Sequence, residues 1–187
     1  MGTRSLVTLM ALSLVATQAA PAAPSPSLFP LAAGNRWTLR DVERGGSATV
    51  SVGQSRAAGL VLRGFPGTAE LRVRTAGSTV EAWDTGNDRW EPFLRLGARA
   101  GTKYTVSLSG FTLWRGAVIT VASRHAIVED ARGKTLRDCV RLTIRPPKGL
   151  ADAGIEELEF APGIGLVRVS EITIAGVRER LLASFEL

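Results

Sequence analysis

The chain has 187 residues and a formal net charge of +6, from 23 Lys and Arg against 17 Asp and Glu. Only three of the cations are lysines, and the arginines are spread singly rather than clustered, which argues against nucleic-acid binding. A single cysteine allows no internal disulfide bond, so a hydrophobic core must hold the fold together.

The first residues have the pattern of a secretory signal peptide. Arg4 is a basic start, residues 6–16 are an apolar run, and small residues follow. We expect removal of residues 1–19, with cleavage between positions 19 and 22. No cysteine stands there to accept a lipid, and no later apolar run approaches the roughly 20 residues of a membrane helix. The sequence predicts a periplasmic or secreted bacterial protein that is neither lipidated nor transmembrane.

The segment 20–27 is rich in proline and alanine, which favours an extended, disordered lead-in. Residues 28–187 then form one β-domain, because apolar and polar residues alternate with a period of two and Gly- or Asn-containing turn signals separate the runs. The clearest inward series are Leu71 and Val73; Val140, Leu142 and Ile144; and Val167 and Val169. The turn signals lie at 44–46, 84–88, 130–133 and 175–176.

The fold class predicted from this periodicity is all-β, with little helix after the signal peptide. About eight to eleven strands should form an antiparallel meander, curled into a half-open barrel or folded into a sandwich so that its edges are protected. The tail 177–187 also reads as a strand. Its predicted inward residues are Val177, Leu181, Ala183, Phe185 and Leu187.

A weak internal echo links two strand starts. The run 34–38 (GNRWT) is answered by 101–105 (GTKYT), each a glycine followed by an aromatic residue and threonine. The echo marks either two related halves or a strand entry that is common in β-proteins.

The stretch 159–171 places Pro162, Gly163 and Gly165 between two strand-like runs. Proline donates no ladder hydrogen bond and glycine tolerates positive φ, so this run predicts a sharp bend. Glycines also permit close approach by a packed aromatic or a ligand, and Trp37 is a candidate partner. As candidate ligand-binding residues we therefore take Trp37, Phe160, Gly163 and Gly165.

A family resemblance rests on short motifs that span nearly the whole mature chain. They are FPLxxGNxWT at 29–38, the run 96–104, DCV at 138–140 and FAPGIGLV at 160–167. This set resembles the TapB-like group of exported bacterial domains of unknown function. The resemblance extends, more distantly, to the half-barrels of periplasmic lipoprotein carriers, and it implies an apolar concavity that holds an acyl chain.

Residues able to carry chemistry are few, and we expect no catalytic site, no metal site and no cofactor. His125, the only histidine, falls in phase with Ile119 and Val121 and so reads as a core residue. No GxSxG motif is present, and one histidine with one cysteine does not make a zinc site. Acidic residues at 156, 157 and 159 read as solvated.

Cys139 has two interpretations. Strict alternation places it opposite Val140, beside Arg137 and Arg141, whose charges would favour a reactive thiolate. The interpretation that we favour is a small buried residue beneath a loop.

Three classes of function follow. The first is a non-catalytic binding domain for a lipid or hydrophobic chain, consistent with the export signal and the 45% hydrophobic composition. The alternatives are an envelope module that binds another protein and, more distantly, a hydrolase centred on His125.

Overall fold

The computed structural model describes residues 26–55, 57–147, 149 and 153–187. The predicted signal peptide and residues 20–25 of the predicted lead-in lie outside this part of the chain. All regular structure in the described residues is β-strand and turn, and no described segment is a helix long and apolar enough to cross a membrane.

Twelve strands are present, one more than the upper end of the expected range. β3 and β7 are only four and three residues long, which is too short for alternation to be recognised in the sequence. The strands are β1 (Arg36–Asp41), β2 (Ser47–Gln54), β3 (Leu60–Arg63), β4 (Glu70–Ala76), β5 (Thr79–Asp84), β6 (Arg89–Arg95), β7 (Lys103–Thr105), β8 (Val118–Glu129), β9 (Thr135–Arg145), β10 (Gly154–Ala161), β11 (Gly165–Thr173) and β12 (Gly176–Glu186).

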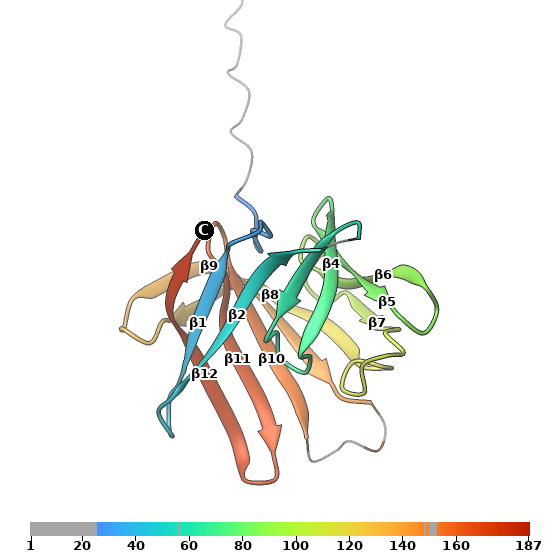
Figure 1. Ribbon diagram of the computed structural model, residues 1–187. Helices are drawn as coiled ribbons and strands as arrows, with labels where there is room; N and C mark the ends of the chain where they lie inside the picture. Colours follow the sequence, from blue (N-terminus) through green and yellow to red (C-terminus); the bar gives the residue numbers. More distant parts are fainter. Residues whose placement is uncertain (1–25, 56, 148, 150–152) are drawn as a thin grey trace, which may run out of the picture.

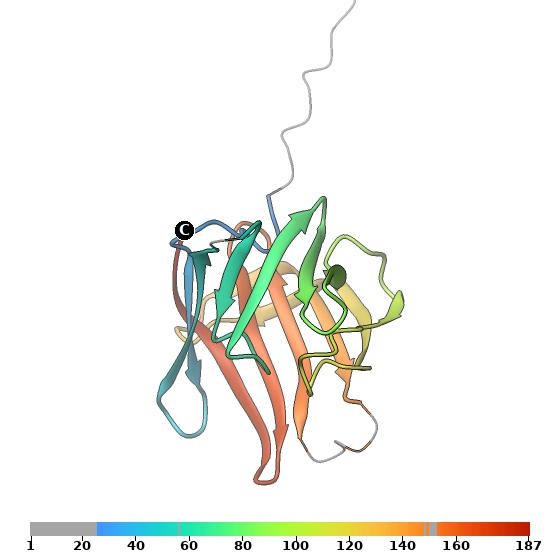
Figure 2. The same ribbon diagram turned by 45° about the vertical axis from the view of Figure 1, so that its right-hand side comes forward.

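The strands form a single antiparallel sheet in the order β6-β5-β4-β3-β2-β1-β12-β11-β10-β9-β8-β7. The first and last strands are therefore neighbours in the middle of the sheet, and β6 and β7 are its two edges. The sheet curls round on itself without closing (Figures 1 and 2). The predicted all-β, half-open architecture is confirmed, and the four predicted turns each connect consecutive strands.

The inside of the curled sheet is filled by side chains. All the predicted inward residues of the three clear series are buried, as alternation requires. Large side chains fill the centre, and among those that are fully buried are Trp37, Trp114, Phe65, Phe93 and Phe160. This interior is a packed core and not an empty concavity.

Side chains join the two edge strands where no ladder connects them. The hydroxyl of Tyr104 in β7 donates to the carbonyl of Phe93 and accepts from the amide of Arg95, both in β6, at 3.3 and 3.1 Å. Burial raises the pKa of Tyr104 to about 12, so the phenol keeps the proton that it donates. Trp114 Nε1 donates to the carbonyl of Pro66 at 3.1 Å. We call this set of contacts the seam.

The tail is a strand, as predicted, but its inward face is the predicted one only where Phe185 pairs with Trp37, and it is the opposite one where Leu182 pairs with Leu39. Leu182 is its buried residue, whereas Val177 and Phe185 are exposed. A register irregularity between Thr38 and Leu39 of β1 shifts the pairing with β12. One extra residue in a pair of strands reverses which side chains face inward.

The two echoed segments have the same backbone hydrogen bonds. Gly34 N donates to Val52 O and Val52 N donates to Asn35 O; Gly101 N donates to Val121 O and Val121 N donates to Thr102 O. The aromatic residue that follows, Trp37 or Tyr104, is buried in both cases. The shared geometry favours the interpretation that β1–β6 and β7–β12 are two related halves.

The buried carboxylate of Asp84 adds a further link across the seam. It accepts from the amide of Ser109 at 3.0 Å, from the Ser109 hydroxyl, from Asn87 Nδ2 and from the amide of Gly86. Burial alone would raise the pKa of Asp84, but these hydrogen bonds, that of the Ser109 hydroxyl first, outweigh it and leave the pKa below its ordinary value. The ionised form is therefore the one that stabilises the fold.

We predict that Asp84→Asn lowers the free energy of unfolding at pH 7 by about 1 to 3 kcal/mol, because buried donors lose a charged acceptor. Since the folded pKa is depressed, the stabilisation is complete above the unfolded pKa of about 3.9 and disappears as the pH falls through the folded value. Urea unfolding between pH 2 and 7 should show a weaker acid dependence in the variant. Asp88→Asn, in the same turn and exposed, is the control; equal acid dependence of wild type and Asp84→Asn would contradict the assignment.

Candidate functional site

The pairing of β8 with β9 is irregular near one end of the molecule. Between Val121 and Ala126, β8 has two more residues than the facing part of β9, and between Ala126 and Val128 the surplus residue is in β9. Asp138, in the second irregularity, has a φ of 54°. Such β-bulges re-aim side chains and are frequent beside functional sites.

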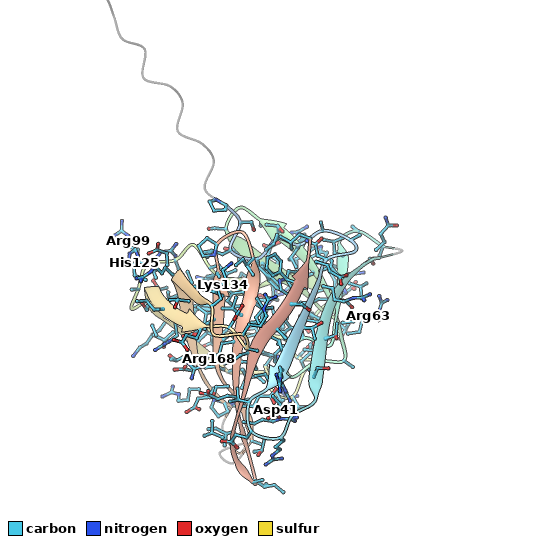
Figure 3. All side chains as sticks on the ribbon, turned by 90° about the vertical axis from the view of Figure 1, so that its left-hand side faces the viewer. Asp41, Arg63, Arg99, His125, Lys134 and Arg168 are labelled. Atoms are coloured by element: carbon cyan, nitrogen blue, oxygen red, sulfur yellow. The ribbon has the colours of Figure 1, made fainter. Side chains whose placement is uncertain are left out.

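The bulges turn His125 outward, so its predicted core position is wrong. Its side chain is 84% exposed, and Ala126 is buried instead. The imidazole Nδ1 lies 3.0 Å from Oδ1 of Asp138, which is itself largely exposed. Figure 3 shows His125 toward the wide end of the molecule, where the N-terminal segment leaves the sheet, whereas Asp41 lies toward the tapered end.

A cavity of about 630 Å³ lies at this wide end. The N-terminal segment 26–29, the β4–β5 turn and the β6–β7 connection form its rim, together with the bulged parts of β8 and β9. The lining residues include apolar ones, namely Leu28, Phe29, Val80, Leu96 and Pro162, and polar ones, namely Arg124, His125, Asp138 and several Ser and Thr residues.

Arg124 is the half-buried cation of this lining. Its Nη1 donates to the carbonyls of Leu96 at 2.7 Å and Ala98 at 3.0 Å, and so ties bulged β8 to the β6–β7 connection. No carboxylate of the described residues forms an ion pair with it. Arg124 was not among the predicted site residues, because a bulge leaves no mark in the alternation of apolar and polar residues.

The bend at 162–165 packs against Trp37. The indole is fully buried and its Nε1 donates to the carbonyl of Ile164 at 2.6 Å. Gly165 has a φ of 108°, and a Cβ placed on it would lie 2.6 Å from Trp37 Nε1. The glycine therefore allows the close approach of an aromatic side chain, which is the packing partner that the sequence suggested.

The same bend anchors one wall of the cavity. Gly163 N donates to the carbonyl of Ser27 at 2.8 Å and thereby holds the N-terminal segment across the wide end. Phe29, from that segment, lines the cavity and packs on Trp37 and on the fully buried Phe160, with ring centroids 4.9 and 5.2 Å apart.

The four predicted ligand-binding residues thus come together as a packed cluster behind the cavity. None of Trp37, Phe160, Gly163 and Gly165 lines the cavity itself, whereas their neighbours Phe29 and Pro162 do. Direct contact between these four residues and a ligand stays a prediction. The contacts that they make in the structure hold the bend and the cavity wall in place.

Cys139 is buried, so its placement on the outer face is wrong and the buried alternative holds. The bulge at Asp138 brings Cys139 inward beside Val140. Burial, and next the charge of Glu159, raises the pKa of the thiol to about 11; the opposing effect of Arg141 is smaller. Flanking guanidinium groups therefore do not favour the thiolate here, and reactivity of Cys139 stays a hypothesis.

Of the Ser, His and Asp that a hydrolase centred on His125 would need, the described residues bring together His125 and Asp138 alone. Among the described residues no Ser, Thr or Cys side chain is hydrogen-bonded to the imidazole. No three His, Cys, Asp or Glu residues in that part of the chain are grouped so that they could hold a metal ion.

No family model and no curated protein matches this sequence. Two solved structures are similar in fold. One is a protein from Bacteroides fragilis, described as exported and YmcC-like in fold, with 13% identity, a TM-score of 0.43, and coverage of 87% of this chain and 100% of its own. The other is described as a lipoprotein from Parabacteroides distasonis, with 10% identity, a TM-score of 0.42 and coverage of 88% and 100%. Similarity at this level extends to no ligand, partner or location.

We predict that Gly165→Ala is far more damaging than Gly163→Ala. Both positions have positive φ, which costs about 1 to 2 kcal/mol for a residue with a side chain. At Gly163 the added Cβ meets only Pro26 at 3.6 Å, whereas at Gly165 it overlaps the Trp37 ring. Thermal and urea unfolding should show a loss of more than about 3 kcal/mol for Gly165→Ala. Equal losses in the two variants would show that the indole contact does not constrain this position.

We also predict that native Cys139 reacts slowly with iodoacetamide. With a pKa of about 11, little thiolate forms at pH 8, and burial blocks access. Labelling followed by mass spectrometry should be at least about a hundredfold slower in the native protein than in urea, and should accelerate as the pH rises toward 11. Native labelling as fast as in urea would instead support a reactive thiol.

Proposed function

We propose that this protein is an exported, non-catalytic binding domain that holds an amphiphile with a hydrocarbon chain in the cavity at its wide end. The observation that carries the proposal is that one lining contains both apolar side chains and charged or polar ones. The volume of about 630 Å³ lies within the roughly 300 to 1,000 Å³ of small-molecule sites, which are mostly apolar with a few placed polar groups.

The proposed place of the ligand differs from the concavity that the carrier resemblance implies. Since the interior of the sheet is filled by aromatic and aliphatic side chains, the hydrocarbon chain would lie on half-buried Leu28, where the cavity meets the core residues Val80 and Leu96. The TapB-like resemblance and the signal-peptide pattern of residues 1–19 support export and a lipid-related ligand, and both remain proposals.

A second candidate function, binding of an envelope protein, is favoured by one outer-face feature. Trp83 and Trp90 are cross-strand neighbours on β5 and β6, with ring centroids 5.3 Å apart, and Arg72 stacks over Trp83 at 3.8 Å. Half-exposed tryptophan and arginine are enriched at protein interfaces. The cluster shares no residue with the cavity lining.

The cavity is tested with the mature protein and a fluorescent apolar probe, N-phenyl-1-naphthylamine, displaced by dodecanol. We predict saturable binding, weakened about tenfold or more by Leu28→Asp, because a carboxylate on the apolar part of the lining must be desolvated by the ligand. Ile174→Asp, on an exposed hairpin tip outside the cavity, is the matched control.

Saturable binding that Leu28→Asp weakens and Ile174→Asp does not would support the cavity. Absence of probe and dodecanol binding in the folded wild type would overturn the proposal. Equal weakening by both substitutions would assign the binding to a different surface.

A further inference from the structure

We infer that the polar end of the ligand is an anion, a carboxylate or a phosphate ester, and that Arg124 binds it. This inference rests on the proposed function, because it concerns the same cavity. The mixture of apolar and polar lining residues predicts an amphiphile, and Arg124 adds which class of amphiphile the cavity selects.

The guanidinium of Arg124 is held by the backbone on one side only. Both carbonyls that it contacts accept from the same nitrogen, Nη1, so the backbone of the β6–β7 connection fixes one corner of the guanidinium. A guanidinium has five N–H donors, and Nε and Nη2 carry three of them. The described residues provide no hydrogen-bond acceptor for these three. A fixed, planar fork with free donors suits bidentate binding of a carboxylate or phosphate.

The charged residues that the structure describes in the lining leave Arg124 without a counter-ion. It contains one arginine, one histidine and one aspartate. The aspartate, Asp138, lies 3.0 Å from the imidazole of His125 and is not paired with Arg124. Arg124 is thus the cation of the cavity without a counter-ion among the described residues, and a half-buried cation is stabilised by an anion brought to it.

Arg124 is hydrogen-bonded to Leu96, which is one of the apolar residues of the lining. Leu96 accepts from Arg124 through its carbonyl and is itself a lining residue of the cavity, as Val80 and Leu28 are. An anion on the guanidinium would therefore have its attached hydrocarbon chain next to apolar side chains. Single-chain amphiphiles such as fatty acids and alkyl phosphates have this arrangement of groups.

The experiment compares dodecanoate, dodecyl phosphate and dodecanol as competitors of the apolar probe, each below its micellar concentration. We expect wild type to bind the better of the two anions about tenfold or more tightly than dodecanol, with the difference shrinking as salt is added. Tighter binding of dodecanoate would indicate a free fatty acid, and tighter binding of dodecyl phosphate a phospholipid-type head group.

Arg124→Gln should remove the preference for the anion, measured as the ratio of its affinity to that of dodecanol for the same variant, because a neutral amide cannot pair with the charge. Arg124→Lys should retain part of the preference, because it keeps the charge without the fork. Thermal melts of both variants check the fold. If Arg124→Gln does not fold, the preference of wild type for the anions over dodecanol, and the effect of salt on that preference, decide whether the ligand is an anion.

Failure of this inference is distinguishable from failure of the proposed function. Equal affinity of wild type for dodecanol and for both anions would overturn the role of Arg124 and leave the binding cavity in place. An anion preference that persists unchanged in Arg124→Gln would also overturn it. Absence of binding by all three amphiphiles would overturn both proposals.

Discussion

The wide end of this protein depends on the contact between the Trp37 indole and the backbone at Gly165. The indole lies where any side chain at position 165 would have to be, and its N–H satisfies the carbonyl of Ile164. This contact fixes the bend between β10 and β11, and the amide of Gly163 in that bend holds Ser27. Phe29 is then packed on Trp37 and becomes part of the cavity wall. Trp37 and the glycine bend thereby position the wall of the cavity, although neither Trp37 nor the two glycines line it.

The second determinant is the irregular pairing of β8 with β9. In a regular ladder, successive side chains alternate between the packed inside and the outside, and Arg124, His125 and Asp138 would be separated accordingly. The surplus residues break that alternation, so that all three side chains border one cavity. The other strand pairs have fewer irregularities, and one of them, between Val80 and Glu81 of β5, also borders the cavity.

Sequence reasoning succeeded where alternation is unbroken and failed where residues are inserted into a strand pair. Leu71, Val73, Leu142 and Val169 are buried as predicted, and the bend at 162–165 meets the aromatic partner that was suggested for it. His125, Cys139 and Leu182 have the opposite orientation from the one expected, because a bulge reverses the phase and leaves no compositional signal. Glu159 was expected to be solvated, yet it is fully buried and paired with Arg141 from the neighbouring strand. The cavity was not predictable, since its lining combines segments as far apart in sequence as Pro26 and Pro162, whose proximity only the sheet order creates.

The pairing of β1 with β12 has a consequence for how the chain acquires its structure. Arg36 faces Glu186, so the ladder in the middle of the sheet cannot form until almost the entire polypeptide is present. Before that moment each half is an open meander with two unpaired edges and an uncovered apolar face, and closing so long a loop delays the final step. In a chain with this arrangement, local hairpins can pair during synthesis, but the strand at the end made first waits for its ladder partner. The chain completes its core only after its last strand has emerged, whichever end emerges first.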